Sequence, residues 1–141
     1  MKKFLVPVDG STASLRALRE AVRLARLVPG SSLHLVHVYE PAQLNGALAE
    51  HVSREDIESL QRRNAEVVLE RAEAEVRDSG VPYSREALKG PIADTIASHA
   101  ENLACDAIIM GRHGKRLADF FAGSVALRVL QASKLPVMLV P

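Results

Sequence analysis

Two glycine-containing turns hold the side chains of this sequence that could take part in chemistry. The first places Asp9 directly before a Gly-Ser pair, and the second, residues 111–116, reads Gly-Arg-His-Gly-Lys-Arg. Glycines let the backbone approach a ligand closely, free amides at a helix start attract phosphate, and a carboxylate can accept a hydrogen bond from a ribose hydroxyl. The turns therefore indicate a nucleotide site, although any parallel α/β domain also needs glycines in its turns and serine caps on its helices.

The elements that must position these turns alternate along the chain. Three- and four-residue apolar spacing predicts helices between short apolar runs, which predict strands at residues 4–8, 33–39, 81–88, 107–110 and 136–140. This alternation predicts one α/β domain, residues 1–141, with an open parallel five-stranded sheet and helices on both faces. Polar residues at 84–86 dilute the third run, which suits an edge strand. In such sheets ligands bind beyond the carboxyl ends of the strands, where the strand order reverses.

The helices carry recognisable start signals. Ser11 or Thr12 is expected to cap the first, Ser53 the second and Ser124 the last, while Pro91 stands in the first turn of the third. Residues 40–52 have no clear period and are interpreted as a loop.

The spacing of the second turn resembles a known family signature. Gly111-x-x-Gly114, then residues 115–122, then Gly123-Ser124-Val125 are similar to the nucleotide-binding signature of the universal stress protein family. The resemblance extends over the whole chain, through Val-Pro-Val-Asp-Gly-Ser at 6–11, Leu-Val-His-Val at 35–38 and Gly-Pro-Ile at 90–92. It implies the strand order 3-2-1-4-5.

This resemblance also implies a ligand and roles for particular residues. The ligand would be an adenine nucleotide: ATP, with AMP and ADP as alternatives, often together with Mg or Mn. Asp9 and Gly111 would hold the ribose, and the backbone near Pro7 and Val38 would border the adenine. The residues that the resemblance places around the phosphates are Gly114, Gly123, Ser124 and Val125. Arg112 and His113 of the same turn are added on their own chemistry: Arg112 brings positive charge, and His113 could contact a phosphate or simply be an exposed turn residue.

The implied function is that of a stress-response or regulatory dimer that binds ATP. Slow hydrolysis at most is expected, because no residue is placed as an obvious base and no arginine finger can be assigned. The protein is therefore expected to be a nucleotide-binding regulator rather than an efficient enzyme. Residues 115–122 number one fewer than in the ATP-binding branch of the family. The rival interpretation is a nucleotide-free dimer of the same family that acts by protein contact alone.

Composition narrows the partners and the compartment. Eighteen basic and seventeen acidic residues leave a formal charge of +1, so bulk charge predicts no nucleic-acid partner. No apolar run is long enough for a membrane span or a signal peptide. The single Cys105 favours a reducing compartment, so the expected location is cytoplasmic. The apolar last strand predicts a homodimer joined through it, unless the last helix and residues 40–52 cover it.

The histidines suggest no metal site by their spacing. His34 and His37 lie three apart in a strand, so they should point to opposite faces and cannot easily share an ion. His99 is expected on the solvent side of its helix. The sequence therefore predicts no metal cluster and no catalytic triad.

Overall fold

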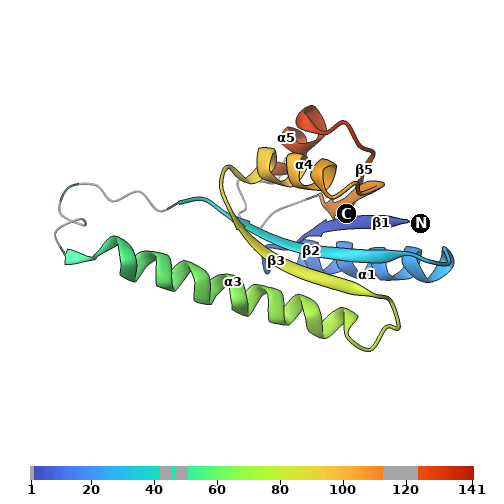
Figure 1. The fold of residues 1–141 in the computed structure, drawn as a ribbon, viewed down its shortest axis with the longest axis horizontal. Coiled ribbons are helices and arrows are strands. Elements are labelled where there is room, and N and C mark those ends of the chain that lie inside the picture. The colour runs from blue at the N-terminus through green and yellow to red at the C-terminus, as the bar shows by residue number, and fades with distance from the viewer. Residues whose placement is uncertain (1, 42–45, 47–50, 113–123) are drawn as a thin grey trace.

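The described part of the chain forms a parallel sheet between two helical layers. The computed structural model describes residues 2–41, 46, 51–112 and 124–141. Their elements are β1 (Lys3–Pro7), α1 (Thr12–Leu27), β2 (Ser32–Tyr39), α3 (Arg54–Val76), β3 (Tyr83–Lys89), α4 (Ile92–Asn102), β4 (Ala107–Gly111), α5 (Ser124–Ala132) and β5 (Val137–Val140). The strands lie in the order β3-β2-β1-β4-β5, with α1 and α3 on one face of the sheet and α4 and α5 on the other (Figure 1).

This architecture confirms the fold predicted from the sequence. Every strand pair is parallel, and the strand order is the one implied by the family resemblance. The polar third strand, β3, lies at one edge as expected, and β5 lies at the other. Most of the predicted loop at residues 40–52 falls on residues 42–45 and 47–50, which lie outside the described part.

The alternation of side chains along the central strand divides the core in two. Leu5 of β1 packs against α4 and α5, whereas Val6 packs against α1 and α3, and both side chains are fully buried. Successive residues of a strand point to opposite faces, so an uninterrupted apolar run supplies both layers. Each such side chain contributes about 1.5–3 kcal/mol by burial. The strand ends that carry the turns are therefore held rigidly.

Serine caps set the start of two helices. The Ser11 hydroxyl accepts a hydrogen bond from the Ser14 amide at 3.1 Å, which makes Ser11 rather than Thr12 the cap of α1. Ser53 accepts one from the Asp56 amide at 3.1 Å at the start of α3. Both caps are those that the sequence predicts, and they satisfy amides that the helix itself leaves unpaired. No helix of the described residues is both long and apolar enough to cross a membrane.

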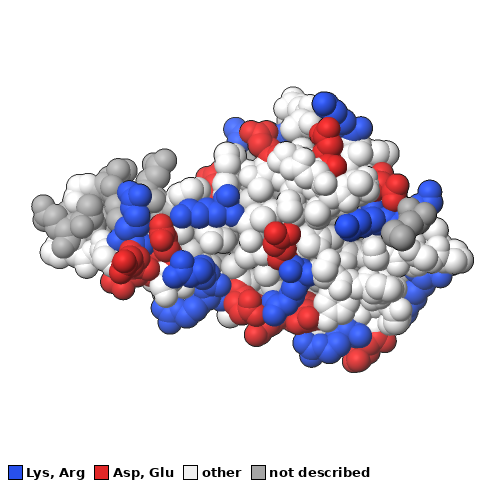
Figure 2. Space-filling view, viewed as in Figure 1, with Lys and Arg blue, Asp and Glu red and all other residues white. Residues whose placement is uncertain are grey.

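The solvent face of α3 carries charges of both signs. Figure 2 shows Lys, Arg, Asp and Glu side chains interspersed over this part of the surface. Ion pairs tie α3 to its neighbours, with Arg19 of α1 bound to Glu75 at 2.9 Å and Arg85 of β3 bound to Glu66 at 2.7 Å. Glu73 accepts a hydrogen bond from the Tyr83 hydroxyl at 2.6 Å and lies near Arg85 and Arg77. These contacts hold α3 over the edge strand.

Glu73 is expected to make stability depend on pH in the acidic range. The Tyr83 hydrogen bond lowers the pKa of the Glu73 carboxyl, and Arg85 and Arg77 act in the same direction against partial desolvation. A carboxyl whose pKa is lower in the folded state stabilises the fold above its unfolded value, near 4.5, and this contribution is lost as pH falls through the folded value. Urea unfolding at pH 7 should show that Glu73→Gln is less stable than wild type, and the difference should shrink at pH 3.

Asp78→Asn is the control for this experiment, because Asp78 is an exposed carboxylate just beyond α3. We expect it to change the free energy of unfolding little at either pH. A Glu73→Gln difference that is the same at pH 3 and pH 7 would show that the carboxylate charge contributes nothing.

Candidate functional site

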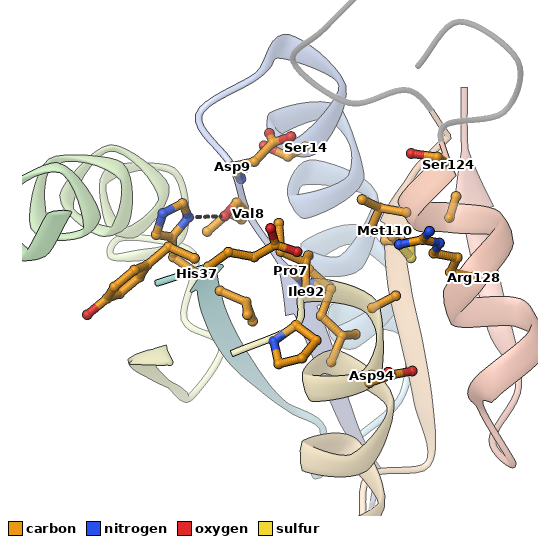
Figure 3. A pocket seen from close by; sticks show the side chains of 18 of the residues that line it. Pro7, Val8, Asp9, Ser14, His37, Ile92, Asp94, Met110, Ser124 and Arg128 are labelled. Atoms are coloured by element: carbon orange, nitrogen blue, oxygen red, sulfur yellow. Dashed lines mark hydrogen bonds between the residues drawn. The ribbon is translucent and has the colours of Figure 1, made fainter. Parts of the chain in front are cut away.

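A large cavity opens at the carboxyl ends of the strands, where the strand order reverses. The chain moves outward from β1 to β2 and β3 and then crosses back to β4, so β1 and β4 flank the reversal point. The cavity has a volume of about 910 Å³ and is lined by residues from both strand ends, from β2 and from α3, α4 and α5 (Figure 3). This is the position at which open parallel sheets bind ligands, and the volume suits a small organic molecule.

The cavity brings together most of the residues singled out in the sequence. Seven of the ten line it: Pro7, Asp9, Val38, Gly111, Arg112, Ser124 and Val125. The other three, His113, Gly114 and Gly123, lie outside the described residues. The convergence of segments more than a hundred residues apart follows from the parallel topology, which places all carboxyl strand ends at one edge. The ligand roles of these residues remain predictions.

Asp9 is held in place by the turn that follows β1. Its Oδ1 accepts a hydrogen bond from the Ser11 amide at 2.8 Å, and its own amide donates to the Ser14 hydroxyl at 3.3 Å. Gly10 has a φ of +84°, a conformation that glycine adopts at no steric cost. The other carboxylate oxygen makes no hydrogen bond with the described residues. Asp9 is therefore a preorganised acceptor on the wall of the cavity (Figure 3).

The structure gives a second reason for glycine at position 111. From the sequence, glycine there is expected to let the backbone approach a ligand, and this expectation stays a prediction. The structure shows in addition a close approach between the end of β4 and α1: a Cβ atom on Gly111 would lie 2.9 Å from both the carbonyl carbon and the oxygen of Ala13. Because these are backbone atoms, neither can move aside without shifting the helix.

We expect Gly111→Ala to lower the free energy of unfolding by about 1–3 kcal/mol, as overpacking of a close contact does. Chemical denaturation measures this change. Gly111 also lines the cavity, so a displaced β4 end should weaken ligand binding as well. Ser133→Ala, at a residue that follows α5 and does not line the cavity, should leave the cavity intact. Wild-type stability in Gly111→Ala would contradict the close contact.

Several cavity residues were not found from the sequence. His37 has its Nδ1 atom 2.8 Å from the Val8 carbonyl oxygen, which can only accept, so Nδ1 donates and the neutral ring leaves Nε2 as an acceptor. The ring also stacks on Tyr39 at a centroid distance of 6.3 Å. Gln61 and Asn64 reach the cavity from α3. No local signal in the sequence marks these residues, because only the tertiary packing of α3 brings them to the site.

The two sides of the cavity differ in chemical character. An apolar wall includes Val38 and Ile92. Met110 lies on the other side of the cavity, near Arg128 (Figure 3). Arg128 and Ser124 of α5 lie together across the cavity from His37 (Figure 3). Their four-residue spacing places them on one face of the helix, and this is a sequence signal that could have identified Arg128. The arrangement suits a ligand with one flat apolar part and one anionic part.

The structure corrects the expectation for the histidines. His34 and His37 do point to opposite faces of β2, as predicted. His99, however, is not on the solvent side of its helix: it is half-buried, and its Nε2 lies 2.8 Å from Glu86 Oε2. His34, Glu86 and His99 form a cluster whose ligand atoms lie within 4.8 Å of one another, an arrangement that the sequence analysis did not foresee. The topology, rather than the spacing, brings these three residues together.

Known proteins resemble this chain along its whole length. The model of the universal stress protein family matches residues 1–141. Universal stress protein MJ0531 of Methanocaldococcus jannaschii is 32% identical over 140 residues, which cover 99% of this chain and 81% of that protein. The structure of MJ0577 from the same organism has a TM-score of 0.84 and 27% identity, covering 99% of this chain and 94% of the other. The universal stress protein of Archaeoglobus fulgidus in complex with dAMP has a TM-score of 0.73 and 26% identity, covering 100% and 98%.

Proposed function

Because this chain belongs to the universal stress protein family, we propose that it binds an adenine nucleotide in the cavity at the ends of β1 and β4. One observation carries the proposal: Asp9 and Gly111 meet at the reversal point of the sheet, in a cavity large enough for a nucleotide. The complex of a neighbour of the same fold with dAMP supports the choice of an adenine nucleotide.

The two sides of the cavity would divide the ligand between them. The flat adenine would lie against the apolar wall near Pro7, Val38 and Ile92. The second carboxylate oxygen of Asp9 would accept a hydrogen bond from a ribose hydroxyl. Both parts of the ligand would thus meet chemistry that suits them.

The phosphates would lie at the start of α5. Amides at a helix N-terminus favour anions, and Arg112 and Arg128 add positive charge beside Ser124. Val125, also in the first turn of α5, lines the same end. We propose ATP as the physiological ligand. A divalent cation, Mg²⁺ or Mn²⁺, would be held mainly by the phosphates and water, so it needs no dedicated protein cage.

The protein would act through its bound state rather than through rapid turnover. We propose a regulatory or stress-response role in the cytoplasm, where the free, buried thiol of Cys105 would stay reduced. Burial raises the pKa of this thiol, so it is a poor nucleophile.

We also propose that two copies associate through β5. This strand is at the edge of the sheet, and its Met138 side chain is 42% exposed. Leu127 and Leu130 of the neighbouring α5 are exposed as well. An open edge with apolar side chains on both sides invites pairing across a two-fold axis, which would cover both copies at once.

Mass spectrometry and calorimetry test the nucleotide proposal. Protein purified without added nucleotide should carry an adenine nucleotide under native conditions, and the stripped protein should bind ATP with one site per chain. Titrations with AMP and ADP show how much each further phosphate adds to the binding affinity. The release of inorganic phosphate from ATP measures any hydrolysis. Failure of ATP, ADP and AMP to bind would overturn the proposal and favour a nucleotide-free dimer that acts by protein contact.

A further inference from the structure

A cluster of His34, Glu86 and His99 lies apart from the nucleotide cavity. His34 is near the start of β2, Glu86 is in β3, and His99 is in the last turn of α4. None of the three lines the cavity, which opens at the other ends of these elements. The cluster therefore needs an explanation of its own.

The register of the sheet creates half of this cluster. His34 shares a face of β2 with Val36 and Val38, which pack in the core beneath α4 and α5. It pairs with Ser84 of β3, so Glu86, two residues further along, is its diagonal neighbour on the same face. Helix α4 crosses this face and brings His99 to the same point. The histidine in β2 is thus placed on a covered face, where an apolar residue is the usual choice.

The donor atoms converge on a single point. His34 Nε2 lies 3.0 Å from Glu86 Oε2, and His99 Nε2 lies 2.8 Å from the same oxygen atom. One ligand atom from each residue lies within 4.8 Å of the other two. An ion bound at about 2.0–2.2 Å in tetrahedral geometry separates its donor atoms by roughly 3.3–3.6 Å. Binding would require the 40% exposed Glu86 side chain to move back slightly and the two imidazole rings to turn toward each other.

Ser84 contacts the other ring nitrogen of His34. Its hydroxyl oxygen lies 2.5 Å from Nδ1 of His34. A metal-binding histidine typically donates its second N–H to an oxygen, which fixes the ring and the tautomer. In the metal-free protein Nε2 donates to the Glu86 carboxylate, so the Ser84 hydroxyl donates to Nδ1. When Nε2 binds a metal ion, the proton moves to Nδ1, and the Ser84 oxygen can then accept it.

From this geometry we propose that His34 Nε2, His99 Nε2 and a Glu86 carboxylate oxygen bind one Zn²⁺ ion. Two imidazoles and one carboxylate form a donor set typical of zinc sites that keep a fourth position for water. Mg²⁺ and Ca²⁺ prefer oxygen ligands throughout, so this set discriminates against both. The exposed Glu86 side leaves room for the fourth ligand and a route from solvent. The ion would join β2, β3 and α4 at the edge of the sheet.

Calorimetry with ZnCl₂ tests this site directly. The full chain, without a polyhistidine tag, is treated with EDTA, exchanged into metal-free buffer and titrated. We expect one Zn²⁺ per chain, with affinity at least about tenfold weaker in His99→Gln and in Glu86→Gln, because loss of a direct ligand should cost no less than loss of a supporting contact. His51→Gln is the matched control, since His51 is exposed and outside the cluster. Absence of stoichiometric binding, or equal affinity in all four proteins, would overturn the proposal.

A spectroscopic measurement on wild type removes any dependence on how the variants fold. In the metal-free protein the Glu86 carboxylate accepts from both Nε2 atoms, so those nitrogens carry the protons. One equivalent of Zn²⁺ should move the proton of His34 and of His99 to Nδ1, which ¹⁵N spectra of the imidazole rings distinguish. Unchanged ring nitrogens in both residues after addition of Zn²⁺ would also overturn the proposal. Neither experiment depends on nucleotide binding.

Discussion

Replacing Asp9 with alanine is expected to weaken ATP binding by roughly 10- to 150-fold. The proposed contact is a hydrogen bond from a ribose hydroxyl to the carboxylate, and a hydrogen bond to a charged group is worth about 1.5–3 kcal/mol. The turn around Asp9 holds its Oδ1 with the Ser11 amide at 2.8 Å, so the acceptor is in place before the ligand arrives. Calorimetric titration of the stripped protein with ATP measures the change.

Asp9→Asn separates the ligand contact from the geometry of the turn. The asparagine oxygen can still accept from the Ser11 amide, but its NH₂ group cannot accept from a ribose hydroxyl. We therefore expect Asn to retain the stability of wild type while losing most of the affinity that Ala loses. Asp78→Asn, on an exposed residue outside the cavity, is the control for a change in charge. Wild-type affinity in Asp9→Asn would exclude the ribose contact.

Much of the fold could be predicted because its signals are local. The apolar run of β4 is fully explained by burial on both faces, and the polar run of β3 by its edge position. The Ser11 cap follows from the side chain and its place before an amphipathic helix. Parallel topology then brings Asp9 and Gly111 to one edge of the sheet, so the location of the cavity followed from the element order alone.

The parts of the site that could not be predicted depend on packing between distant segments. His37 and Gln61 reach the cavity because of the way β2 ends and α3 crosses the sheet. The need for glycine at 111 comes from the backbone of Ala13, which no sequence spacing reveals. Neither His34 nor His99 stands in a local sequence pattern that indicates a metal ligand. Only the register of β2 with β3 and the crossing of α4 place both rings on one carboxylate oxygen.

Met138→Asp is expected to raise the dissociation constant of the proposed homodimer by at least about a hundredfold. Met138 stands in the edge strand β5, so pairing across a two-fold axis would bury it in both copies. An unpaired buried charge costs about 3–5 kcal/mol, and tenfold in affinity corresponds to about 1.4 kcal/mol. Sedimentation equilibrium at micromolar concentration should show a dimer for wild type and a species near 15.3 kDa for the variant.

Val67→Asp makes a similar change on the exposed face of α3, away from this edge, and should remain dimeric. A wild-type chain that sediments near 15.3 kDa, or a Met138→Asp dimer as tight as wild type, would rule out assembly through β5, because the substituted side chain could not then lie in the interface.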